Sequence, residues 1–166
     1  MPYPIRPAYV EGSGTPVVRH YVRGSGTAWT VIGAPVGISS GVIDEHAGGS
    51  TVTGILGFAL ALPSTAPGYD MANSTLLLQV ANRANEVPVA IATRNQVFYG
   101  TLRNGDTTTL TAPAVANLRT YGLIKCTAGD WAVDVSDTTD VVVRVVAINA
   151  TEKLVWFKVI ESALVP

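Results

Sequence analysis

The sequence predicts an all-β protein: a single β-barrel, β-tulip-like or sandwich domain with an extended N-terminal arm. Roughly ten short segments rich in Val, Thr, Ile and aromatic residues recur at spacings near 8–12 residues, as in sandwiches and barrels. Gly, Asn and Asp separate most of these segments, which is typical of turns between strands. Only residues 113–120, PAVANLRT, permit a helical turn.

The first 15 residues, MPYPIRPAYVEGSGT, form a distinct front that we assign to an arm, with the β-rich domain at 16–166. Prolines at positions 2, 4 and 7 fix φ and favour extended backbone before them, so this stretch is not a helix. A spacer would be Gly/Ser-rich or charged, whereas this segment carries large apolar residues. We therefore expect it to dock on a partner, the alternative being a frayed terminus. The expected contact residues are Tyr3, Pro4, Ile5, Arg6, Pro7, Tyr9 and Val10.

The predicted strands follow in chain order. Two GSGT sequences, at 12–15 and 24–27, enclose the β-rich run PVVRHYVR. Gly54 and Gly57 indicate a bulge or bend inside the strand at 51–62. The strands expected after residue 27 span 28–33, 51–62, 74–81, 87–93, 96–103, 106–112, 120–125, 131–135, 141–149 and 153–161.

Three connections are specific enough to predict hairpins or breaks. Asn104-Gly105 predicts a type I′ turn joining 96–103 to 106–112, because both residue types tolerate positive φ. Residues 128–130, Ala-Gly-Asp, separate the strands at 120–125 and 131–135. Residues 150–152 connect the last two strands as a closing hairpin.

Charge is scarce in this chain, and this scarcity bears on function. Only 14% of residues are charged, against about a quarter in an average domain, while 48% are hydrophobic. The net charge is −1 and no window forms a basic stripe, so we expect no nucleic-acid partner. The longest apolar window, Ile55–Leu62, is far short of about 20 residues, and no signal peptide is expected, so no membrane role is predicted. Because so few residues are charged, we predict that other protein subunits cover part of the surface of this chain.

Candidate catalytic motifs are weak. Residues 37–41 match G-x-S-x-G, but no helical pattern follows the serine, so we predict a loop between strands and not a nucleophile elbow. Asp44 and Glu45 are predicted to lie in a solvated loop, as is His46. His20 alternates with valines in a strand, and neither histidine has companions at metal-ligand spacing. We therefore expect no catalytic residue, metal or cofactor, and no enzyme activity.

Three further residue sets carry weaker indications. The lone Cys126 lies in an apolar segment and is predicted to be a buried structural thiol. Asp134, Asp137 and Asp140 recur every third residue, which suits a turn and leaves open whether the loop binds an ion such as Ca²⁺. Trp29, Trp131 and Trp156 fall in separate strands, where core or interface packing is expected and a sugar-binding platform is the alternative.

Two stretches resemble capsid decoration (cement) proteins of tailed bacteriophages. In residues 36–67, which include IDEHAGGSTVTGILGFALALPSTAP, a Gly-rich loop precedes a short G-x-x-G-x-A strand at 54–59, as in those proteins. In residues 104–149 a Thr-rich strand leads to YGL at 121–123 and then to W-x-V-D-x-S-D-T-T at 131–139, before a closing hairpin. The likeness covers residues 30–161 and is best over 96–161.

The resemblance implies a non-catalytic virion protein on the outer capsid surface, made in the host cytoplasm. Such proteins clamp adjacent major capsid protein subunits, often as trimers, so we expect the major capsid protein as partner and a homo-oligomer, with a trimer favoured. In that group an extended N-terminal arm commonly reaches over the shell, which suits residues 1–15. The alternatives are another phage structural module, such as a head fibre, tail or baseplate component, or a carbohydrate-binding domain.

Overall fold

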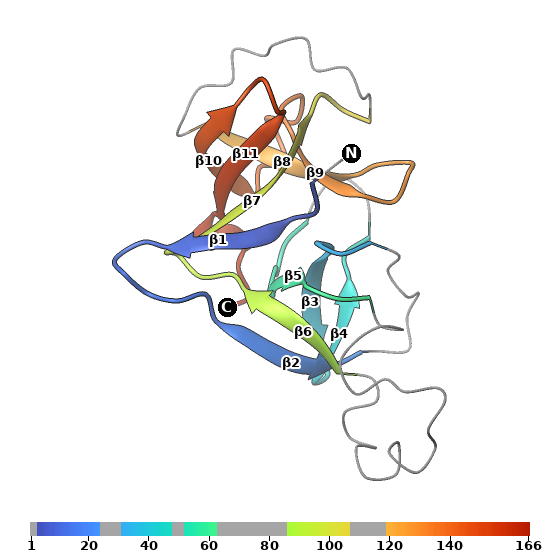
Figure 1. Cartoon of the computed structure of the whole chain (residues 1–166). Coiled ribbons are helices and arrows are strands. Elements are labelled where there is room, and N and C mark those ends of the chain that lie inside the picture. The colour runs from blue at the N-terminus through green and yellow to red at the C-terminus, as the bar shows by residue number, and fades with distance from the viewer. Residues whose placement is uncertain (1–2, 24–30, 48–51, 63–85, 107–118) are drawn as a thin grey trace.

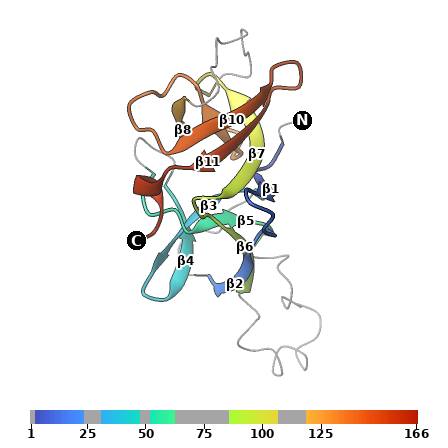
Figure 2. The same ribbon diagram turned by 90° about the vertical axis from the view of Figure 1, so that its left-hand side faces the viewer.

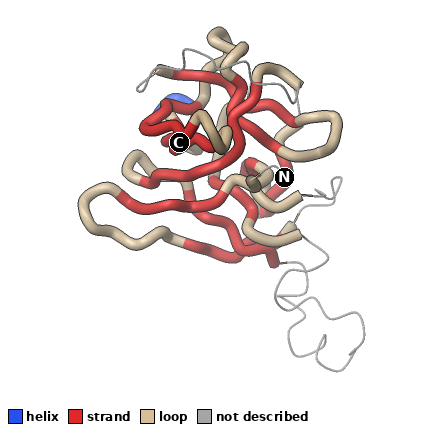
Figure 3. Tube along the Cα trace, turned by 45° about the horizontal axis from the view of Figure 1, so that its top comes forward, coloured by secondary structure: helices blue, strands red, loops and turns tan. Residues whose placement is uncertain are grey.

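The computed structural model describes residues 3–23, 31–47, 52–62, 86–106 and 119–166, and its architecture is all-β as predicted (Figure 1). Strands are the main regular structure of the described trace, and the helical content there is a single 3₁₀ turn, Glu161–Ala163, near the C-terminus (Figure 3). The strands are β1 Arg6–Val10, β2 Val18–Val22, β3 Pro35–Ser39, β4 Val42–Glu45, β5 Gly57–Ala59, β6 Glu86–Ile91, β7 Gln96–Arg103, β8 Thr120–Lys125, β9 Trp131–Asp134, β10 Val143–Asn149 and β11 Leu154–Val159.

Five strands close into a small mixed barrel, which confirms the predicted barrel. Its order is β7-β11-β10-β8-β9, and β9 returns to β7 in parallel, with Leu102 opposite Val133 and Arg103 opposite Asp134. The other pairings within the barrel are antiparallel. Strand β1 adds to β7 outside the closed ring. Closure satisfies backbone groups that an open sheet would leave unpaired at its edges.

A separate five-stranded antiparallel sheet lies beside the barrel, in the order β2-β6-β5-β3-β4 (Figures 1 and 2). Its outer strands approach each other at one end, where Arg23 forms a bridge with Ile43. Strands β6 and β7 carry the chain directly from this sheet into the barrel, so the two units are continuous at that point.

One hydrophobic core serves both sheets. Phe58 from β5 meets Phe98 from β7 edge to face, with ring centroids 4.7 Å apart, and Phe157 from β11 lies 6.0–6.1 Å from both. All three rings are fully buried. The C-terminal segment also ties the units together, because Leu164 forms a bridge with Ile55. The shared core makes the sheet and the barrel one packed body.

Several local predictions are confirmed. The break at 128–130 turns β8 into β9, with Gly129 at φ +92°, and 150–152 turns β10 into β11. The strand predicted at 51–62 is interrupted: within it only Gly57–Ala59 is a β-strand of the second sheet, and Gly54 has φ +71°. A Cβ at Gly57 would lie 2.1 Å from the carbonyl oxygen of Ala90, so the absent side chain lets β5 and β6 approach.

The type I′ turn predicted at Asn104-Gly105 is wrong. Gly105 has φ +63°, but Asn104 is not among the described residues with positive φ. The end of β7 instead pairs in parallel with β9, at Leu102 and Arg103. The predicted strand at 106–112 lies outside the described residues beyond Asp106, as do the predicted strand at 74–81, residues 28–30 and residues 113–118. Residues 31–33, the described half of the strand predicted at 28–33, form a bend and a turn.

Candidate interaction surface on the N-terminal strands

The predicted N-terminal arm is extended, and it lies against its own barrel. Strand β1 pairs antiparallel with β7 from Arg6 opposite Tyr99 to Val10 opposite Gln96, with a bulge between Pro7 and Tyr9. The prolines are compatible with this position because an edge strand can lack some backbone donors. The arm is therefore an integral edge strand in this structure.

Ile5 anchors the arm. Its side chain is fully buried in the shared core. Two glycines make room for it: a Cβ at Gly33 would lie 2.4 Å from the Ile5 backbone nitrogen, and one at Gly100 would lie 2.9 Å from Ile5 Cγ1. Gly33 also has φ +90°, which side chains rarely tolerate. Close backbone approach at these two positions forms a socket for Ile5.

Polar groups hold the arm on both sides of that socket. The Tyr3 backbone N–H donates to Thr101 Oγ1 at 2.6 Å, and the same hydroxyl donates to the Tyr3 carbonyl at 3.1 Å. Further along, the buried Gln96 amide donates to the carbonyls of Tyr9 at 3.1 Å and Val97 at 2.7 Å. The Tyr3 hydroxyl donates to Glu152, whose charge raises the pKa of that phenol.

The seven predicted contact residues divide into three groups. Ile5 is buried within the chain itself and has no surface to offer in this conformation. Pro4, Pro7 and Val10 are half-buried. Tyr3, Arg6 and Tyr9 are exposed and are available to a partner. That these residues contact a capsid stays a prediction.

Strand β2 also exposes apolar side chains, and the sequence did not single it out as a contact surface. It is the edge strand of the second sheet and pairs with β6, while Tyr21 points inward against the core. Val18, His20 and Val22 alternate with Tyr21 and are exposed, as is Val17 just before the strand. The large apolar side chains that stand exposed among the described residues are Tyr3, Tyr9, Val17, Val18, Val22 and Ile38, each between 40% and 46% accessible.

Edge strands β1 and β2 are consecutive in the chain and belong to different sheets, joined by the loop 11–17 (Figures 1 and 2). Together with that loop they bring Tyr9, Val17, Val18 and Val22 onto one continuous stretch of chain. We call this stretch, residues 9–22, the N-terminal edge. The only sequence signal for it was the run PVVRHYVR, whose valines give no indication of whether a strand is central or at an edge.

The prediction that Glu45 lies in a solvated loop is wrong. Strand β4 includes Asp44 and Glu45, and the Glu45 side chain is only 7% exposed. Its carboxylate accepts from Lys125 Nζ at 2.7 Å and from the Trp131 indole N–H at 2.8 Å. Because Lys125 and Trp131 belong to the barrel, this buried carboxylate connects the two sheets. Charge pairing and hydrogen bonding make its burial tolerable.

The G-x-S-x-G motif, predicted to be a loop between strands, lies mostly in strand β3, and only Ser40 and Gly41 form the turn of a hairpin to β4. Ser40 and Gly41 have φ +51° and +81°, the pattern of a type I′ turn between β3 and β4. Ser39 lies at the tip of this hairpin opposite Val42, and the chain enters β4 and not a helix. His46 is half-buried against the Gly37 Cα, and burial lowers the pKa of its imidazole.

The aspartate loop forms turns. Asp134 Oδ1 accepts from the Gly105 N–H at 2.8 Å and from the Ser136 N–H at 2.8 Å and hydroxyl at 2.6 Å. Asp137 Oδ1 accepts from the N–H groups of Thr139 and Asp140. Asp side chains commonly accept such hydrogen bonds from nearby backbone N–H groups in turns. Within the described ranges, no three His, Cys, Asp or Glu side chains gather as a metal site.

Cys126 is buried, as predicted. Burial, helped by the charges of Asp130 and Asp106, raises the pKa of its thiol to about 11. A thiol with that pKa is a poor nucleophile at neutral pH. Trp131 is buried in the core and Trp156 is half-buried on β11, while Trp29 lies outside the described residues.

Comparisons with known proteins add no relative. The described residues include no helix that is long and apolar enough to span a membrane. No protein-family model, curated protein or solved structure matches this chain.

Proposed function

We propose that this chain is a virion structural protein that binds the outer surface of a tailed-phage capsid and stabilises contacts between major capsid protein subunits. The observation that carries the proposal is the N-terminal edge, where exposed valines and Tyr9 lie on two edge strands of a chain with only 14% charged residues. Exposed apolar side chains grouped along edge strands are candidates for a protein contact site. The resemblance of residues 30–161 to cement proteins supplies the kind of partner.

Edge strands suit this role for a physical reason. An extended segment of a partner can add to a free edge through main-chain hydrogen bonds, while alternate side chains fill pockets on either side. On β2 the outward row is Val18, His20 and Val22, which presents apolar surface to such a partner. The role requires binding across subunits and no turnover.

The free energy of binding that each copy contributes is modest, and many copies bound to one shell give a strong total effect. Burying a whole Val side chain contributes about 1.5–3 kcal/mol, so burying the roughly 40% that each edge valine exposes contributes roughly 0.6–1.2 kcal/mol. Many copies on one shell, or a trimer that engages several subunits at once, raise the effective strength. The partner is then the assembled shell more than the free capsid subunit.

The test is cosedimentation of the full-length protein with shells stripped of decoration. The double variant Val18→Asp with Val22→Asp introduces charge at exposed edge positions, so it is expected to fold and to lose at least tenfold in shell affinity. Thr151→Asp, at the exposed turn between β10 and β11, is the matched control and is expected to bind like wild type. Failure of the wild-type chain to bind shells, or equal binding by the double variant, would refute the proposal.

The number of copies per particle distinguishes a cement protein from the main alternative, another phage structural module. Quantitative mass analysis of purified particles is expected to show hundreds of copies for a protein that covers a shell. A count of a few to tens would instead favour a tail, baseplate or head-fibre component.

A further inference from the structure

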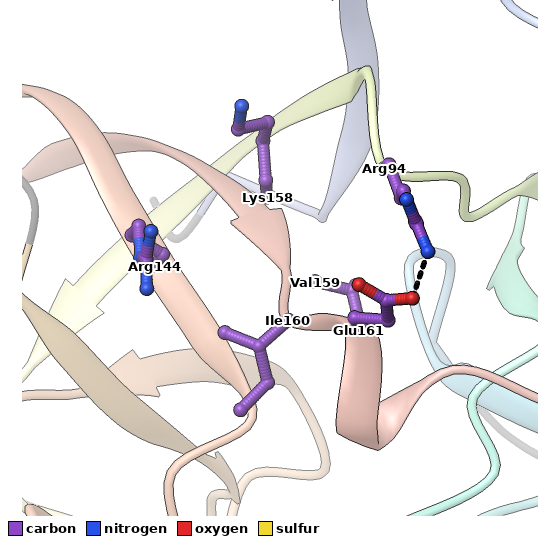
Figure 4. A pocket seen from close by; sticks show the side chains of 6 residues that line it. All are labelled: Arg94, Arg144, Lys158, Val159, Ile160 and Glu161. Atoms are coloured by element: carbon purple, nitrogen blue, oxygen red, sulfur yellow. Dashed lines mark hydrogen bonds and ion pairs between the residues drawn. The ribbon is translucent and has the colours of Figure 1, made fainter.

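A small basic pocket lies on the barrel, far along the chain from the N-terminal edge. It has a volume of about 230 Å³ and lies where β10, β11 and the loop after β6 meet (Figure 4). Its lining residues are Arg94, Arg144, Lys158, Val159, Ile160 and Glu161. Three of the six are cations in a chain that has few charges.

Strand register places two of these cations next to each other. Arg144 on β10 is directly opposite Lys158 on β11. Side chains in that relation have Cβ atoms about 5 Å apart, and like charges there repel. The neighbour of Arg144 on the other side is Thr120 on β8, which brings no compensating charge.

Two of the three cations already have a carboxylate partner, and Arg144 is the third. Glu161 is paired with Arg94, as the dashed line in Figure 4 shows. Lys158 Nζ donates to Glu11 at 2.8 Å, a residue that follows β1 and does not line the pocket. Arg144 is exposed, and the described residues place no carboxylate within ion-pair distance of it. Three cations and two carboxylates leave a net positive charge beside the cavity.

We propose that this pocket binds a single oxyanion group, a carboxylate or a phosphate, through Arg144 and Lys158. The Arg144 guanidinium offers a planar fork that matches the oxygens of either group, and Lys158 adds a point charge. Both residues line the pocket and stand opposite each other on paired strands of the barrel, so the backbone sets their spacing before the anion arrives. Glu11 offsets the charge of Lys158, so the positive charge that a bound anion would neutralise is mainly that of Arg144.

The test is a titration of the full-length protein with sodium phosphate at constant ionic strength, in which the NMR chemical shifts of the backbone amides are monitored. The expected result is saturable movement of the amides of Arg144, Lys158 and Val159. Arg144→Gln is expected to weaken phosphate binding at least tenfold, whereas Arg19→Gln, an exposed arginine on β2, leaves it unchanged. A parallel titration with sodium acetate distinguishes the carboxylate from the phosphate source.

A second variant keeps the test decisive if Arg144→Gln alters folding. Arg144→Glu replaces the repulsion with an attraction to Lys158, so it is expected to raise the melting temperature in chloride and to abolish the phosphate response. Equal shifts in wild type, Arg144→Gln and Arg19→Gln would mean general salt binding, and no saturable shift in wild type would mean no site. Either result overturns the proposal.

Discussion

Replacing Ile5 with alanine tests whether the N-terminal strand is part of the folded domain. Ile5 is fully buried, and the substitution removes three carbons. At about 0.8 kcal/mol per buried methylene the transfer loss is about 2.4 kcal/mol, and the residual cavity adds to it. We expect the free energy of unfolding to fall by about 3 kcal/mol, with a drop in melting temperature of roughly 6–12 °C for a chain of this size.

Gly100 offers a second, independent measure of the same contact. In the wild-type background Gly100→Ala would place a Cβ 2.9 Å from Ile5 Cγ1, and such overpacking costs about 1–3 kcal/mol. In the Ile5→Ala background the new methyl group occupies vacated space, so its cost should fall below about 1 kcal/mol. The double variant is therefore expected to be more stable than the sum of the single changes predicts, by up to about 2 kcal/mol.

Urea unfolding followed by circular dichroism measures all four proteins of this cycle. Val22→Ala, on the exposed face of β2, is the control and should change stability by less than about 0.5 kcal/mol. A loss under about 1 kcal/mol for Ile5→Ala, together with strict additivity in the cycle, would show that the arm is not packed in its socket.

Three further predictions concern buried polar groups. Glu45→Gln removes the charge that Lys125 and Trp131 contact. Because Lys125 is partly exposed, we expect the free energy of unfolding in urea to fall by about 1–3 kcal/mol. An unchanged free energy would show that Glu45 does not stabilise the contact between the two sheets. Cys126, with its thiol pKa raised from 9.0 to about 11, should react with iodoacetamide at pH 8 about 100-fold more slowly in the native than in the unfolded chain, and equal rates would contradict its burial. Burial lowers the pKa of His46 below 6.5, so the unfolded chain gains a proton first as pH falls; stability should decline from pH 7 to pH 5, and His46→Asn should flatten that decline.

Local patterns in the chain predict individual strands and turns well. The closing hairpin of β10 and β11 and the break at 128–130 both depend on residues near one another in sequence. Period-2 alternation and Gly conformations act over a few residues, so they can be recognised without knowing the fold. The buried thiol of Cys126 was predictable for the same reason, from its apolar neighbours.

The failures concern residues whose surroundings come from distant segments. Asn104-Gly105 has the composition of a type I′ turn, yet Asn104 lacks the positive φ that this turn requires, and Arg103 just before it pairs in parallel with β9, some 30 residues away. Glu45 has the composition of a loop residue, yet Lys125 and Trp131 from the barrel surround its carboxylate. Neither outcome can be read from a window around the residue.

The sequence by itself determines the all-β class, the positions of most described strands and the low fraction of charged residues. The tertiary structure alone decides that the arm returns to its own barrel, that β2 ends its sheet and leaves Val18 and Val22 exposed, and that Arg144 stands opposite Lys158. The physical reason is that strand propensity is local, whereas burial, edge position and cross-strand register are set by which distant strands pair.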